Sequence, residues 1–199
     1  MNSRSTIHLA GAALGLLAFA TASDTLAADP AESQAAAMQH PVRNGDRRKT
    51  NELVKIVRQV TAKYREVEVA EADGYHSMFG CVSGDSSGAM GLHYVNLGLY
   101  ADGKIDAYQP EIVIYEPTSS GRPRLIGADY IVDAATWDET HSQAPELNGQ
   151  IFHYYAAPNR YGLNAFYTLH VWAWKDNPTG TFVNWHQEVS CDAHDGASK

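Results

Sequence analysis

The sequence predicts an α+β fold, with one long N-terminal helix packed on a curved, mainly antiparallel β-sheet or partial barrel. The first observation is an apolar stripe between Lys49 and Ala72, whose members recur at steps of three and four. The second is a series of short runs after Gly74 that are rich in β-branched and aromatic residues. A helix with one apolar face needs a second layer to cover it, and these runs supply a sheet.

The predicted helix covers roughly residues 49–72. Thr50 or Asn51 is a suitable N-cap, and Gly74 follows the last turn, where helices commonly stop. The apolar stripe that would face the sheet consists of Leu53, Ile56, Val57, Val60, Tyr64 and Val67.

The strands are predicted from runs that Gly, Pro, Asn or Asp bound on each side. These runs are LHYVNLGLY, EIVIYEP, PRLIGADYIV, YTLHVWAW and GTFVNW. The segment TSSGRP, Thr118 to Pro123, is predicted to be the hairpin connection between the second and third runs. Before the first run, FGCVSGDSSGAMG is typical of a Gly/Ser loop, and the long connections near 134–166 have little pattern.

The start of the chain has the layout of a secretory signal peptide, predicted over residues 1–27. Arg4 is followed by an apolar run and then by small residues that allow cleavage after Ala22 or, preferably, Ala27. The run is too short to span a membrane, and no Cys lies near either site to carry a lipid anchor. We therefore expect a periplasmic or secreted protein without a membrane anchor.

The rest of the chain is predicted to contain one domain. Residues 28–46 are Ala-rich and polar and are expected to form a mobile leader, followed by a domain over 47–192 and a disordered tail over 193–199. The formal net charge is −8, from 15 Lys and Arg against 23 Asp and Glu. Because phosphate binding needs a basic face, this balance argues against a nucleic-acid partner.

The only two cysteines are Cys81 and Cys191. In an oxidising compartment an even pair favours a disulfide, which would tie the last strand to the loop before His93. The alternative is a pair of reduced thiolates that bind a metal, which export disfavours.

Two histidines and two carboxylates lie within different predicted strands. His93 and His170 are inside apolar runs, Glu116 ends a third run, and Asp129 interrupts a fourth. A carboxylate that faces an apolar layer is costly unless it is paired or bound to a cation. Neutral imidazole and carboxylate suit Zn, Cu or non-haem Fe, so we predict one transition-metal ion held by these four residues.

Other interpretations of the same residues stay open. A single strand histidine is commonly a core residue that bonds to a backbone carbonyl, and Glu116 can face solvent at its strand end. Asp129 can pair with Arg122 or Arg124. The sequence contains no H-E-x-x-H, G-x-S-x-G, P-loop or C-x-x-C pattern, so it does not select a reaction. An open metal position would allow hydrolase, lyase or oxygenase chemistry.

Aromatic residues suggest a second class of function. Trp172 and Trp174 alternate with His170 in one run, and His153 follows an aromatic residue, so these side chains are candidates to hold an unknown small apolar or aromatic molecule. The alternative is that the tryptophans are large core fillers. A third hypothesis is a disulfide-tied structural or partner-binding module without a small-molecule site.

Several segments together resemble a family of uncharacterised secreted bacterial proteins. The resemblance runs from about Val57 to Cys191 and includes MGLHYVN, HVWAW followed by NPTG, and the closing VSC. It implies no known activity, but it supports the disulfide and places Glu where this chain has Asp129, which keeps a carboxylate there. The family pattern reads Trp-Asn-Pro where this chain has Trp185, His186 and Gln187, so the resemblance disfavours His186 as a ligand.

Overall fold

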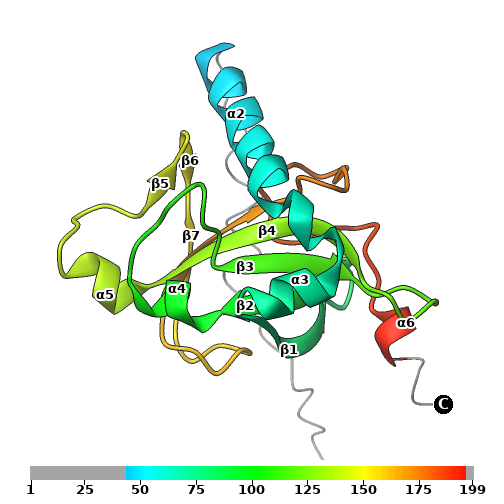
Figure 1. Cartoon of the computed structure of the whole chain (residues 1–199). Helices are drawn as coiled ribbons and strands as arrows, with labels where there is room; N and C mark the ends of the chain where they lie inside the picture. The colour runs from blue at the N-terminus through cyan, green and yellow to red at the C-terminus, as the bar shows by residue number, and fades with distance from the viewer. Residues whose placement is uncertain (1–43, 196–199) are drawn as a thin grey trace, which may run out of the picture.

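The structure is a computed structural model, and it describes residues 44–195. The predicted signal peptide, the leader as far as residue 43 and the last four residues of the predicted tail lie outside the described residues. The described part forms an α+β fold whose centre is an antiparallel sheet, with the N-terminal helices packed on one of its faces (Figure 1).

Six strands form the main sheet, and every neighbouring pair is antiparallel. Their order across the sheet is β1 (Tyr75–Ser83), β2 (Ala89–Asn96), β3 (Ile112–Glu116), β4 (Arg124–Asp133), β8 (Phe166–Val171) and β7 (His153–Tyr155). The sheet is open, with β1 and β7 at its edges, so the predicted alternative of a partial barrel is wrong for the described residues. The predicted hairpin connection between β3 and β4 is confirmed.

The connections around the sheet contain the smaller elements. A second, two-stranded sheet pairs β5 (Glu146–Leu147) with β6 (Gln150–Ile151), within the region that has little pattern in the sequence. Three short helices are α4 (Leu97–Ala101), α5 (Ala134–Asp138) and α6 (Asp192–Asp195). The predicted strand GTFVNW does not form, because residues 180–185 pass over the sheet as an irregular segment.

The predicted long helix is divided into three parts. These are α2 (Asn44–Thr61), the 3₁₀ helix η1 (Ala62–Arg65) and α3 (Val67–Ala72). Glu66 between η1 and α3 is extended, with φ −94° and ψ 113°, and this redirects the chain. Because of the change in direction, α2 and α3 cover different parts of the sheet (Figure 1).

Strand alternation gives the sheet two apolar faces. On the helix-covered face, Leu53 and Val57 of α2 pack with Tyr130 of β4 and Leu169 of β8. This packing confirms that the apolar stripe of the helix covers the sheet. The residues one position away along each strand point to the opposite face, where a separate apolar cluster includes Ile112, Ile131, Phe166 and Trp172.

The face away from the helices is covered by irregular segments of the chain. The C-terminal segment pairs with β2 through reciprocal backbone hydrogen bonds between Ala89 and His186, at 3.2 and 3.1 Å. The predicted disulfide is confirmed: Cys81 of β1 is joined to Cys191, with the Cα atoms 5.7 Å apart. The loop between β7 and β8 brings Tyr161 and Leu163 against the same cluster.

Candidate metal centre

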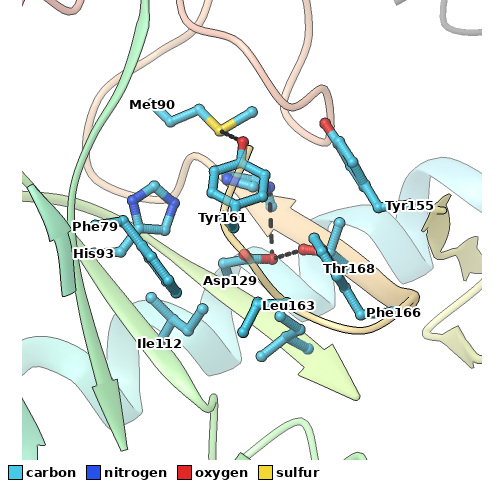
Figure 2. Close-up of a pocket in the computed structure, with 12 residues that line it drawn as sticks. Phe79, Met90, His93, Ile112, Asp129, Tyr155, Tyr161, Leu163, Phe166 and Thr168 are labelled. Atoms are coloured by element: carbon cyan, nitrogen blue, oxygen red, sulfur yellow. Dashed lines mark hydrogen bonds and ion pairs between the residues drawn. The ribbon is translucent and has the colours of Figure 1, made fainter. Parts of the chain in front are cut away.

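Sheet pairing brings two of the predicted histidines and one predicted carboxylate together. Asp129 on β4 pairs directly with His170 on β8, while His93 lies on β2, on the other side of β3. All three side chains line one cavity on the face away from α2. Figure 2 shows His93 and Asp129 at this cavity, together with Ile112 of β3. Successive members are 36 and 41 positions apart in the sequence (129 − 93 and 170 − 129), so the sheet and not a local motif assembles them.

The three side chains are close enough to share one ion. One potential ligand atom from each residue lies within 4.8 Å of the other two. The His93 and His170 ring centroids are 5.7 Å apart with an interplanar angle of 76°, and Nδ1 of His170 lies 3.5 Å from Oδ1 of Asp129. Below, "the triad" means His93, Asp129 and His170.

Asp129 is a buried carboxylate with one strong hydrogen bond. Its side chain accepts a hydrogen bond of 2.6 Å from the hydroxyl of Thr168, which lies two residues before His170 on β8. Burial raises the pKa of Asp129 to about 6, although the Thr168 hydrogen bond acts in the opposite direction. The carboxylate is therefore mainly ionised at neutral pH.

His93 is oriented by the backbone of its own strand. Its Nδ1 lies 3.3 Å from the carbonyl oxygen of Gly91, which can only accept, so Nδ1 donates and Nε2 keeps its lone pair. Gly91 has φ 91°, and a Cβ there would collide with the Tyr115 carbonyl. Burial, with a smaller contribution from His170, lowers the pKa of His93 to about 4.

His170 is buried without a hydrogen-bond partner. No described residue makes a hydrogen bond of normal length to either ring nitrogen, although the Asn184 side chain lies near enough to act as a weak partner. The 3.5 Å separation from Asp129 is too long for a well-formed hydrogen bond. Burial lowers the pKa of His170 to about 3, His153 lowers it further, and the Asn184 side chain acts in the opposite direction.

Glu116 is not part of this group, which corrects one of the predicted ligands. It pairs with Arg124, its cross-strand neighbour, and with Nζ of Lys175 at 2.7 Å. Burial alone would raise the pKa of Glu116, but the hydrogen bonds from Lys175 and Arg124 outweigh it and lower the pKa. The carboxylate is therefore compensated by two cations, and Arg124 pairs with Glu116 instead of with Asp129.

The predicted aromatic ligand surface does not form, because its members point to different places. Trp172 is 2% exposed and donates to the Val183 carbonyl, on the triad's side of the sheet. Strand β8 ends at Val171, so the alternation stops there, and Trp174 instead donates to Thr61 on the helix-covered side. Nε2 of His153 lies 3.3 Å from the carbonyl of Phe182.

A small cavity lies next to the triad. Its volume is about 30 Å³, and its other walls include Phe79, Met90, Tyr161 and Leu163 (Figure 2). Sequence reasoning misses these residues, because Phe79 lies in a bulge of β1 and Tyr161 and Leu163 lie in a loop. Thr168 could have been found from its position, since it shares the strand face of His170.

No protein-family model, curated protein or solved structure matches the chain. Within residues 44–195, no helix is both long and apolar enough to cross a membrane. The chemical interpretation of the triad therefore depends on its own geometry: two neutral imidazoles and one carboxylate, all buried, converge beside a cavity.

Proposed function

We propose that the protein binds one transition-metal ion through His93, His170 and Asp129. The observation that supports this most directly is the convergence of the three potential ligand atoms within 4.8 Å, all from buried side chains on separate strands. A buried carboxylate without a cationic partner is costly, and a bound cation would remove that cost.

The unpartnered nitrogens of His170 support a bound metal over an ordinary core histidine. His93 has the backbone partner that a structural histidine needs, whereas among the described residues His170 has only the distant Asp129 carboxylate and the weak partner Asn184. A buried polar group without a partner costs about 1–3 kcal/mol. Coordination through one ring nitrogen would use the lone pair that is otherwise left unsatisfied.

The donor set indicates which ions to test. Two imidazole nitrogens and one carboxylate oxygen suit Zn, Cu or Fe better than Ca or Mg. The lowered pKa values of His93 and His170 keep both imidazoles neutral at pH 7, so protons do not compete for them. Since ligands held about 2.1 Å from one ion lie about 3–3.5 Å apart, binding would draw the group together.

Three protein ligands leave at least one coordination position for water or a substrate, as in catalytic metal sites. The proposed site is therefore compatible with a metal-dependent enzyme, in which the ion would act as a Lewis acid or bind a small reactant. We also propose that the protein works outside the cytoplasm. The Cys81–Cys191 disulfide supports that location, since such bonds persist in oxidising compartments.

Metal content of the purified full chain tests the proposal. After exposure to Zn²⁺, Cu²⁺ or anaerobic Fe²⁺ and removal of excess ion, we expect near-stoichiometric binding of at least one ion. His93→Ala, His170→Ala and Asp129→Asn should each abolish stoichiometric binding. Two matched controls, His141→Ala on the surface and Glu116→Gln outside the triad, should retain it. Binding that survives all three triad changes, or a folded wild type that takes up none of the ions, would contradict the proposal.

A further inference from the structure

The cavity beside the triad is bounded by aromatic side chains on its outer side. Phe79 and Tyr161 make an edge-to-face contact with centroids 5.7 Å apart, and Tyr161 lies in front of the triad in Figure 2. The Tyr161 hydroxyl donates to the thioether sulfur of Met90 at 3.5 Å, which holds its ring across the cavity. These two rings therefore limit the width of the approach to the triad.

Phe79 is held in an unusual backbone conformation. Its φ is 68°, in the left-handed region that bulky side chains rarely adopt, and it is 38% exposed. The β1–β2 pairing skips from Met78 to Cys81, so Phe79 and Gly80 form a bulge at the sheet edge. Strained residues of this kind are concentrated at functional sites, where the strain positions a side chain. Here the bulge directs Phe79 toward the cavity that contains the triad.

A second cavity of about 30 Å³ adjoins the first one. Both are lined by Phe79, Ile112, Ile131 and Leu163, so these four side chains separate them. The second cavity is also lined by Leu97, which is 54% exposed. None of the described residues that line it carries a charge. The two cavities therefore form one apolar region beside the triad, divided by shared side chains.

The size and lining of these cavities restrict what can reach the triad. A polar site needs roughly 10–15 Å³ to hold one water molecule, so a space of about 30 Å³ suits a molecule of only a few heavy atoms. No Lys or Arg occurs among the described residues that line the inner cavity, and Asp129 would repel an anion. Phosphate, sulfate and carboxylate ligands are therefore disfavoured, whereas an uncharged molecule meets no electrostatic barrier.

We infer that the inner cavity binds an uncharged molecule of two or three atoms, the class that includes dioxygen, beside the metal position, and that Phe79 and Tyr161 exclude larger molecules. That this molecule would also coordinate a metal ion rests on the proposed function. The cavity and its size limit are features of the chain itself and can be tested without any metal.

Dissolved dioxygen is a direct probe, because it is paramagnetic and speeds the relaxation of nearby methyl groups in NMR. In the metal-free full chain under oxygen pressure, the Ile112 and Ile131 methyls should relax several-fold faster than those of Leu53 and Val57. All four residues are buried, but the last two pack on the other face of the sheet. Equal effects on the two groups of methyls would overturn the inference.

Two substitutions test the position of the cavity and its size limit. Leu163→Trp, which fills space shared by both cavities, should remove the oxygen effect at Ile112 and Ile131, while the matched surface change Ile151→Trp should preserve it. Benzene should leave the wild-type cavity methyls unshifted but shift them in Phe79→Gly, in which glycine suits the left-handed φ. Benzene entry into the wild type, or oxygen effects that persist in Leu163→Trp, would contradict the assignment.

The outcomes separate this inference from the proposed function. If the protein admits dioxygen but takes up no metal, the inference about the cavity is supported and the proposed metal centre is refuted. If it binds metal through the triad but shows no selective oxygen effect, the metal centre is supported and the inference about the cavity is refuted.

Discussion

Replacing His170 by Leu should have opposite effects on the metal-free and the metal-loaded protein. In the metal-free chain, both ring nitrogens are buried without a hydrogen bond of normal length from the described residues, and an unsatisfied buried polar group costs about 1–3 kcal/mol. Leucine has a similar volume, and an imperfect fit in the core costs up to about 1.5 kcal/mol. We therefore expect the metal-free variant to be more stable by about 1 kcal/mol, or about 2–4 °C in Tm.

The metal reverses this order. At a free ion concentration of about 100 times Kd, the wild type gains about 2.7 kcal/mol, which the variant lacks because a ligand is missing. Calorimetric unfolding with EDTA and with the ion identified by metal analysis measures both states. The control is His76→Leu at an exposed position of β1, with an expected change within about 0.5 kcal/mol. A metal-free His170→Leu variant that is several kcal/mol less stable would refute the reasoning, since it would show that His170 has a stabilising partner.

Three further predictions concern protons and the disulfide. Metal affinity measured by calorimetric titration should fall as the pH drops through about 6, because Asp129 takes up a proton there, and a fall delayed to about pH 4 would assign the effect to the imidazoles instead. Burial raises the pKa of Glu111 to about 8, so the folded state holds a proton that the unfolded state releases above about 4.5, and stability falls as the pH rises through this window. Glu111→Gln should therefore raise the free energy of unfolding at pH 9 by on the order of 3–5 kcal/mol more than it does at pH 5. Urea unfolding at both pH values measures this, and at pH 5 the variant and the wild type should differ little. The same pH dependence of stability in the variant and the wild type would contradict this. Replacing Cys81 and Cys191 by Ser opens a bridge across a sequence separation of 110 and should lower stability by about 4–5 kcal/mol, whereas an unchanged urea midpoint would show that the bridge does not restrict the unfolded chain.

The strands that carry the site could be predicted because their apolar residues alternate with a polar one. His93, Asp129 and His170 each interrupt an apolar run, and this pattern alone makes them candidates. The sequence could not decide between Asp129 and Glu116, because both interrupt or end such runs. The register decides: Asp129 is the direct partner of His170, whereas Glu116 is opposite Arg124.

Other features depend on local backbone departures that composition does not reveal. Alternation could not place Trp174, because the strand ends at Val171 and the next residues leave the sheet. The division of the long helix at Glu66 preserves the apolar stripe, so periodicity gives no indication of it. Phe79 reaches the cavity through a bulge with positive φ, although its neighbours read as a Gly/Ser loop. Each of these depends on tertiary packing.

Anomalous diffraction from crystals soaked in the bound ion tests the central claim most directly. The account predicts one strong peak among the three side chains, about 2.0–2.2 Å from a nitrogen of each imidazole and from a carboxylate oxygen of Asp129. A peak elsewhere on the chain, or fully occupied metal in solution with no peak among these residues, would contradict it.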